Sequence, residues 1–327
     1  MKNELKYFLL AAEELNFTKA AEKAFISQQY MSKCIQHLET SLNVSLFKRR
    51  PKLALTLAGE IVKQYALAQK LQEENLITEL HEINNKEHGQ LVFGLSYGRS
   101  LIILPKILKL YQQRYPNIRI TVKNEMTSLM EKMTINDEID LFLGVNPNES
   151  PYLEQIFLNM ETIYIALSDN LLHRYFSNNY PDCIIQFSNG IDLHELENIP
   201  FCIHPSESIT SQIIQNFMNK ERINLNYPII INGNEIQLEL AMQDCCACFC
   251  QSFLLPFVKN LNSISPKNKL RIFPIKNFDI KYQIALVHRK NTTLPTSTKY
   301  FISLIKQYTI NQLEANSSIL YSLAKID

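Results

Sequence analysis

The sequence FTKAAEKAFISQQYMSKCIQHLE, residues 17–39, decides the architecture of this chain. It reads as two short helices joined by a tight corner, with Thr18 as a candidate N-cap of the first helix. Phe25 and Ile26 are expected to fill the space at the corner. Ser27 is expected to cap the second helix, because its side-chain oxygen can accept from the free N–H groups of the next turn.

The second helix of this pair is predicted to be amphipathic. Met31, Ile35 and Leu38 recur at spacings of three and four residues, so they share one buried stripe. The opposite face is polar, long-reaching and free of acidic residues, which suits a helix that meets base edges and phosphates in a DNA major groove. It presents Gln28, Gln29, Tyr30, Ser32, Lys33 and Gln36. Amphipathic helix pairs also occur in many proteins without DNA partners, so the pair alone does not decide the function.

Apolar residues on both sides of the pair are expected to complete a small core. A helix predicted over residues 3–15 supplies a third wall, because its apolar residues follow helical spacing. These residues are Leu5, Phe8, Leu9, Ala12 and Leu15. The segment after the second helix is expected to close the core with Leu42, Val44, Leu46 and Phe47.

The segment FKRRPKLALT, residues 47–56, is predicted to form a two-stranded wing with a basic tip. Arg49 and Arg50 precede Pro51, and an alternating apolar pattern follows. An ordinary basic turn would show the same residues. Its place directly after the second helix favours a wing, because a wing there can lay cations along neighbouring phosphates.

Residues 5–60 resemble the N-terminal winged helix-turn-helix of the LysR-type transcriptional regulators, a bacterial family. The matching elements are the helix of Phe8, Phe17-Thr18 with Ala20-Ala21, Ser27-Gln28, Ser32-Lys33 with Ile35, Leu38-Glu39, Leu42, Leu46-Phe47 with Arg49, Leu55-Thr56 and Ala58-Gly59. The chain departs from the family pattern at Gln29, where proline is usual, at Lys33, where arginine is usual, and in a wing that is one residue shorter. The resemblance therefore implies the binding mode of the family but not its operator sequence.

The resemblance implies that the second helix enters the major groove and that the wing meets the DNA backbone or minor groove. The residues expected to contact DNA are Thr18, Ser27, Gln28, Gln29, Tyr30, Ser32, Lys33, Gln36, Arg49 and Arg50. The charge distribution is consistent with this. Residues 1–60 contain nine basic and six acidic side chains, although the whole chain carries a net charge of only +1. Any nucleic-acid partner must therefore be met by a local basic patch.

The 327 residues, 46% of them hydrophobic, are enough for two or three domains with sizeable cores. The N-terminus lacks the pattern of a signal peptide, and no apolar run approaches the roughly 20 residues that span a bilayer. We therefore expect a cytoplasmic protein without a membrane partner.

A long helix is predicted over residues 56–83, with Thr56 as its cap, followed by a polar hinge at residues 84–89. A thin apolar seam along a helix of this length is typical of pairing with a second copy. Its residues are Ile61, Tyr65, Ala68, Leu71, Leu76 and Leu80. Docking on the C-terminal part of the same chain remains the alternative. In the LysR-type family this helix dimerises two DNA-binding heads.

From residue 90 onward, short apolar strands alternate with helices, an order that implies parallel sheets with right-handed crossovers. The fold class expected is α+α/β: a winged helix-turn-helix, a long linker helix and two α/β lobes that resemble a type 2 periplasmic-binding-protein fold. The expected boundaries are 1–58 for the DNA-binding domain, 59–88 for the linker and hinge, 89–312 for the effector-binding domain and 313–327 for a C-terminal tail. Lobe 1 is expected over about 90–163 and 270–312, and lobe 2 over about 164–269.

In open α/β sheets, ligands bind beyond the carboxyl ends of strands and close to helix N-termini. The family binds a small-molecule effector between its two lobes, and the loops at matching positions supply the candidates. They are Ser96, Tyr97, Arg99, Ser100, Thr127, Ser128, His204, Ser206 and Ser208. Arg99 could pair with a carboxylate of the effector. The alternative is that the serines and threonines only cap helices.

Four cysteines crowd into residues 245–250. On a strand, Cys246, Cys248 and Cys250 would share one face and Cys245 the other. The CCxCxC spacing is unlike the CxxC pairs of zinc sites, so buried structural thiols are favoured over a thiol or metal sensor. The sequence contains no catalytic constellation, P-loop or dinucleotide fingerprint. We therefore expect neither an enzyme nor a cofactor.

The sequence is best explained by a LysR-type regulator that binds promoter or operator DNA and responds to a small-molecule effector. The resemblance further implies a homodimer, usually assembled into a tetramer, and contact with RNA polymerase. Two alternatives remain open. One is a small-molecule-binding α/β protein without DNA binding, and the other is a thiol- or metal-responsive regulator that uses the Cys245–Cys250 cluster.

Overall fold

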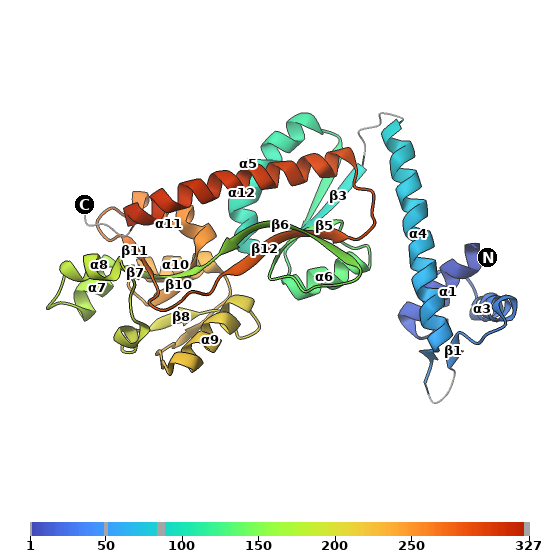
Figure 1. Cartoon of the computed structure of the whole chain (residues 1–327), viewed down its shortest axis with the longest axis horizontal. Helices are drawn as coiled ribbons and strands as arrows, with labels where there is room; N and C mark the ends of the chain where they lie inside the picture. The colour runs from blue at the N-terminus through green and yellow to red at the C-terminus, as the bar shows by residue number, and fades with distance from the viewer. Residues whose placement is uncertain (1, 49–51, 84–88, 324–327) are drawn as a thin grey trace. The chain divides into compact units, whose positions relative to one another are not determined.

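The computed structural model describes residues 2–48, 52–83 and 89–323. These residues form two compact units, of which the first ends with a long helix and the second contains both large β-sheets (Figure 1). Within the described ranges, no helix is both long and apolar enough to cross a membrane.

The first unit is a three-helix head with a wing and a long helix, so the predicted winged helix-turn-helix is confirmed. Its elements are α1 (Lys2–Glu14), α2 (Phe17–Lys23), α3 (Gln28–Leu42), β1 (Phe47–Lys48), β2 (Ala54–Leu55) and α4 (Leu57–Ile83). Met31, Ile35 and Leu38 are fully buried, as the apolar stripe predicts. The ring of Phe47 packs edge-on against Phe8, 5.5 Å between centroids, and closes the core.

Three expectations for the head were wrong in detail. Asn16 caps α2 instead of Thr18, because its side chain accepts from the N–H groups of Thr18 and Lys19. Phe25 does not fill the corner: it is 96% exposed in a left-handed backbone conformation. Leu42, Val44 and Leu15 were expected in the core and are exposed, so only Leu46 and Phe47 close it after α3.

Two contacts fix the wing and the start of α4 on the head. The Glu39 carboxylate accepts from the backbone N–H groups of Leu46 and Phe47, which ties the end of α3 to β1. Thr56 caps α4 as predicted, since its hydroxyl accepts from the N–H of Gly59 at 2.9 Å. A β-carbon at Gly59 would lie 2.2 Å from the Leu46 carbonyl oxygen, so only glycine fits there. The wing tip, with Arg49 and Arg50, lies outside the described residues.

Lobe 1 of the second unit is a five-stranded sheet of order β4-β3-β5-β12-β6, in which β12 alone runs antiparallel to its neighbours β5 and β6. It contains β3 (Gly89–Gly94), α5 (Tyr97–Arg114), β4 (Ile118–Lys123), α6 (Thr127–Ile135), β5 (Leu141–Val145), β6 (Leu153–Glu161) and β12 (Tyr282–Arg289). The predicted β-α-β-α-β order is confirmed. Strand β6 was not foreseen from the sequence.

Lobe 2 is a second five-stranded sheet, of order β11-β7-β10-β8-β9. It contains β7 (Ile163–Ser168), α7 (Asp169–Tyr175), α8 (Asp182–Phe187), η1 (Leu193–Leu196), β8 (Phe201–Ile203), α9 (Ile209–Glu221), β9 (Ile229–Ile230), α10 (Asn234–Met242), β10 (Ala247–Gln251), η2 (Ser252–Leu254), α11 (Leu255–Ile264) and β11 (Leu270–Pro274). Strand β11 pairs with β7, so the assignment of residues 270–274 to lobe 1 was wrong.

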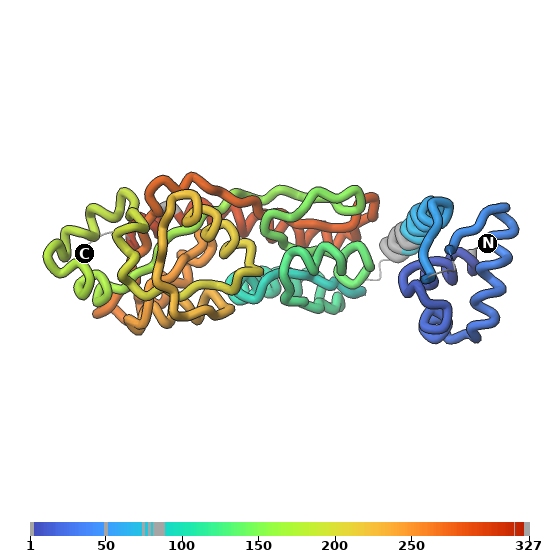
Figure 2. The backbone as a smooth tube through the Cα atoms, turned by 90° about the horizontal axis from the view of Figure 1, so that it is seen from below, coloured from blue at the N-terminus to red at the C-terminus, as the bar shows by residue number. Residues whose placement is uncertain are grey.

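The last helix, α12 (Thr296–Leu323), joins both lobes (Figure 1). Its first half packs on lobe 1, where the ring of Phe301 meets Phe93 at 4.9 Å. Its last turn reaches the core of lobe 2, where Leu323 is buried. The residues from 313 to 323 are therefore helix and not the predicted tail. Figure 2 shows the two lobes side by side, with β6 and the segment after it passing from one to the other.

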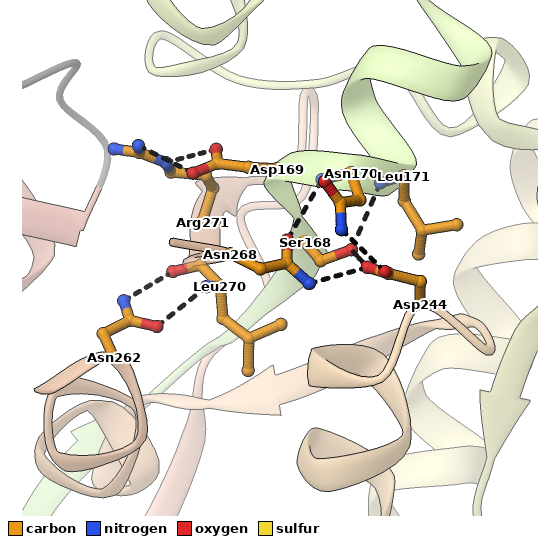
Figure 3. A network of polar contacts seen from close by, with 9 residues as sticks. All are labelled: Ser168, Asp169, Asn170, Leu171, Asp244, Asn262, Asn268, Leu270 and Arg271. Atoms are coloured by element: carbon orange, nitrogen blue, oxygen red, sulfur yellow. Dashed lines mark hydrogen bonds and ion pairs between the residues drawn. The ribbon is translucent and has the colours of Figure 1, made fainter. Parts of the chain in front are cut away.

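A polar network anchors the segment between β7 and β8, which is longer than the family resemblance suggests (Figure 3). Asp244 accepts hydrogen bonds from Ser168, Asn170 and Asn268, which come from separate elements of lobe 2. The bonds lower the pKa of Asp244, although partial burial opposes them. Beside this hub, Arg271 forms two hydrogen bonds with Asp169 at the start of α7.

Candidate nucleic-acid interface and effector site

Helix α3 presents a polar face to solvent on the side opposite its buried stripe. Ser27 caps the helix, since its hydroxyl accepts from the N–H of Tyr30 at 3.2 Å. The exposed side chains on or next to this face are Thr18, Gln28, Gln29, Tyr30, Lys33 and Gln36. Ser32 is half-buried, and its hydroxyl accepts from the amide of Gln28 at 3.0 Å. The structure thus brings the predicted reading residues onto one accessible surface.

The wing carries further cations. Lys48 on β1 and Lys52 after the tip are exposed, and both lie close in sequence to Arg49 and Arg50. Exposed lysines on a wing can each bind a phosphate of the DNA backbone. Phe25, at the corner directly before Ser27, is a further exposed side chain that sequence reasoning had assigned to the core.

The predicted seam on α4 is largely exposed in the single chain. Ile61 is 64% exposed, Leu76 56% and Leu80 47%, and Tyr65 and Ala68 are exposed as well. Leu71 is half-buried. The other side of the helix meets the head, where Ala66 is buried and Val62 packs on the core. An apolar stripe of this extent on a 27-residue helix is unusual for a surface without a partner.

The two lobes meet where α5 and α10 begin. Gly98 lies in the first turn of α5, and Asn234 and Glu235 lie in the first turn of α10. A β-carbon at Gly98 would lie 2.7 Å from the Glu235 carboxylate and 3.1 Å from the Asn234 amide nitrogen. His204, after β8, lies 2.8 Å from the Asn234 amide oxygen through its Nε2. That nitrogen must carry the proton, because an amide oxygen only accepts. Tyr97 is exposed at the same end of α5.

Glu235 and Asn234 were missed in the sequence, although they follow a predicted strand as the other candidates do. No described residue hydrogen-bonds to the buried Oε1 of Glu235. Burial raises the pKa of Glu235 and lowers the pKa of His204, because it disfavours the charged form of each group. A buried acceptor without a partner, placed between two lobes, is suited to a donor on a bound molecule.

Glu235→Gln is expected to raise the free energy of unfolding more at pH 8 than at pH 4. The folded pKa of Glu235 lies above the unfolded one, so the unfolded state loses its proton first as the pH rises. The carboxyl therefore destabilises the fold progressively above its unfolded pKa of about 4.3. Urea unfolding at several pH values measures the difference. Glu239→Gln, at an exposed position of the same helix, is the control, and an equal gain at every pH would contradict the assignment.

Arg99 does not face the position predicted for an effector carboxylate. It is 4% exposed, and both terminal nitrogens bond to the Glu161 carboxylate, at 3.0 and 2.7 Å. Its guanidinium also lies 4.2 Å from the ring centroid of Phe253 in lobe 2. The charge of Arg99 is thus matched inside the protein, which corrects its predicted role.

The other predicted effector residues divide into two groups. Ser96 and Ser208 stand at the N-cap positions of α5 and α9, but neither side chain makes a capping bond, so capping does not explain them. Ser128 and Ser206 are exposed. The hydroxyl groups of the other two form hydrogen bonds inside lobe 1. The Thr127 hydroxyl accepts from the N–H of Val145, and the Ser100 hydroxyl donates to the Tyr97 carbonyl.

The cysteine cluster belongs to the core of lobe 2. Cys246, Cys248 and Cys250 are fully buried with Cys202, as predicted. Cys245 is exposed, but strand alternation is not the reason, because β10 begins only at Ala247 and all its residues are buried. Burial raises the pKa of Cys248 and Cys250 well above the usual value of a thiol, which keeps them protonated and unreactive. Among the described residues, no group of three or more potential ligands could hold a metal ion.

A winged helix-turn-helix joined to a two-lobed α/β domain defines a class of DNA-binding sensor proteins. Residues 3–60 match the family of bacterial regulatory helix-turn-helix proteins of the LysR type, and residues 84–309 match the LysR substrate binding domain. The chain belongs to the LysR family.

Relatives cover the chain to different extents. HcaR, the Hca operon transcriptional activator of Escherichia coli, is 35% identical over 164 residues, which is 50% of this chain and 55% of HcaR. A probable RuBisCO transcriptional regulator of Emiliania huxleyi is 26% identical over 94% of this chain and 92% of its own length. The structure of a cysteine mutant of OxyR from Corynebacterium glutamicum covers 100% of this chain and 96% of its own, with 19% identity and a TM-score of 0.55. This last likeness supports the fold alone.

Proposed function

We propose that the chain is a DNA-binding transcriptional regulator that responds to a small molecule bound between its two lobes. The observation that carries the DNA-binding part is helix α3, whose apolar stripe is fully buried while its glutamines and Lys33 are exposed. In this proposal α3 enters the major groove and Arg49 and Arg50 of the wing lie along the backbone. The matches to regulators such as HcaR support it.

Salt dependence tests DNA binding directly. Affinity for the DNA upstream of its own gene is expected to fall at least about 100-fold between 50 and 200 mM salt, since a dimer would neutralise several phosphates. Fluorescence anisotropy with labelled DNA measures it. An α/β protein that binds only small molecules would show neither the affinity nor the salt dependence.

The effector would contact the residues that surround the meeting point of α5 and α10. In this proposal Ser96, Tyr97, Ser128, His204, Ser206 and Ser208 supply polar contacts, with Glu235 and Asn234 as additions. Ser100 and Thr127 shape the site through their internal bonds, and Arg99 supports it from behind. We propose no enzymatic step and no cofactor.

In this proposal two copies of the chain pair through α4, and two such dimers form a tetramer. The tetramer contacts RNA polymerase at the promoter, in the compartment that holds the DNA. The exposed seam carries the dimer proposal. Its apolar surface is explained if a second α4 covers it.

Leu76→Asp combined with Leu80→Asp is expected to weaken the dimer at least about 100-fold, because each chain loses two buried leucines and gains two charges at the interface. Sedimentation equilibrium measures the dissociation constant. Lys70→Asp, which helical spacing places on the other side of α4, is the control. An unchanged dimer would show that α4 does not form the interface.

A further inference from the structure

A series of hydrogen bonds links α12 to both segments that connect the lobes. Along α12, the Tyr308 hydroxyl donates to Gln312, and the Gln312 amide donates to Asn316 at 2.8 Å. The Asn316 amide then donates to the Ser252 carbonyl oxygen in η2 at 3.1 Å. The series thus leaves α12 and enters lobe 2.

From Ser252 the series continues into the two connections. The Ser252 N–H donates to the carbonyl of Thr162, the single residue between β6 and β7. The Thr162 hydroxyl donates to the carbonyl of Ile280, in the segment between β11 and β12. The side-chain amides of Gln312 and Asn316 each accept one bond and donate the next, an arrangement in which each bond polarises and strengthens its neighbour.

The surroundings of these bonds are packed and leave little free volume. Arg99, Glu161, Asn159 and Phe253 line a cavity of about 30 Å³ together with Tyr308, Gln312 and Asn316. This volume holds about one or two water molecules and no larger ligand. The Arg99–Glu161 pair, 4 and 6% exposed, lies at the end of β6, directly beside Thr162. Both members of this pair belong to lobe 1, so a change of angle between the lobes would disturb the contact of Arg99 with Phe253 of lobe 2 as well as the hydrogen bonds.

Apolar packing holds the two ends of α12 on different lobes. Phe301 is fully buried against Phe93 and Tyr111 of lobe 1, whereas Leu323 is buried in the core of lobe 2 with Ile319 and Leu320 beside it. A straight helix anchored at both ends resists rotation of one lobe against the other.

We propose that residues 312–323 of α12 form a latch that fixes the angle between the two lobes by binding both connecting segments through Ser252. Movement of the lobes then requires the Asn316–Ser252 bond to open. If the effector binds between the lobes, which rests on the function proposed above, the latch limits how far its site can open or close.

Asn316→Asp tests the latch with a side chain of the same shape, because a carboxylate cannot donate to the Ser252 carbonyl. Hydrogen exchange of the full-length protein is expected to accelerate about five-fold or more at the Ser252 N–H and in the connecting segments around Thr162 and Ile280. Exchange in β5 and β10 is expected to remain unchanged. Ser318→Ala is the control, since the Ser318 hydroxyl bonds only to a carbonyl of its own helix.

Two results would overturn the latch. One is unchanged exchange in the connecting segments of Asn316→Asp. The other is acceleration spread equally through β10, which would make α12 an ordinary part of the lobe 2 core. Should Asn316→Asp fail to fold, Gln312→Met interrupts the same series one step earlier, and the same two results decide.

A distance measurement gives an independent readout without DNA or effector. Spin labels at Leu110→Cys on α5 and Ile264→Cys on α11 report on lobe 1 and lobe 2, since both positions are exposed. Cys34 and Cys245 are changed to serine, because the other cysteines are buried. Asn316→Asp is expected to broaden the distance distribution, and an unchanged distribution would contradict the latch.

Discussion

Arg99→Ala is expected to destabilise the second unit by about 3–5 kcal/mol, because it leaves the Glu161 carboxylate buried without its partner. Both side chains are almost fully buried, and two hydrogen bonds join them. For a domain of this size, the loss corresponds to a fall in melting temperature of about 6–20 °C. Thermal and urea unfolding measure it.

Two matched variants show whether the charge pair is responsible. Arg99→Met with Glu161→Leu removes both charges and is expected to stay within about 2 kcal/mol of the natural chain. Lys123→Ala breaks an exposed ion pair with Glu138, at 3.9 Å, and is expected to cost less than about 1 kcal/mol. If Arg99→Ala costs no more than Lys123→Ala, the pair is solvated and not a structural element.

Lys33→Ala combined with Gln36→Ala is expected to weaken specific DNA binding by at least about 100-fold, since each base contact contributes about 1–3 kcal/mol. Both residues are exposed on α3, so the fold of the head is expected to remain intact. Anisotropy titration with DNA from upstream of its own gene measures the loss.

Lys70→Ala serves as the control, because it removes a positive charge from an exposed position in the middle of α4. Its affinity is expected to stay within about three-fold of the natural chain, as a charge far from the groove contributes only through a screened field. A double variant of α3 that binds as tightly as this control would show that α3 is not the reading helix.

The head could be predicted from the sequence because its signals are local. The Met31, Ile35 and Leu38 stripe and the Ser27 cap each follow from neighbouring residues. The misassigned cap and the exposed Phe25 have the same origin. Asn16 and Thr18 are both good capping residues two positions apart, and their backbone conformations decide between them.

Strand β6 could not be recognised from the sequence, because polar residues occupy buried positions and apolar residues occupy exposed ones. Asn159 and Glu161 are buried, whereas Phe157 and Met160 are exposed, so alternation gives no apolar face. Burial of Glu161 is possible only because Arg99 lies opposite, 62 residues away in sequence. The true partner of Arg99 therefore could not be read from either segment alone.

The placement of β11 and the end of α12 also depend on distant contacts. Residues 270–274 have a clear strand pattern, but the pattern does not say which sheet they join. The stretch from Asn311 to Ser318 contains several weak helix formers and gives no local sign that the helix continues through the predicted tail of residues 313–327. Packing of Leu323 in lobe 2 extends it instead.

Hydroxyl-radical footprinting of the full-length protein on the DNA upstream of its own gene tests DNA recognition by paired heads most directly. A dimer that reads DNA through two copies of α3 is expected to protect two half-sites related by a dyad, with centres one helical turn of about 10 base pairs, or a multiple of it, apart. Lys33→Ala with Gln36→Ala is expected to abolish both. Absence of protection in the natural chain, or protection that the double variant retains, would contradict the proposed function.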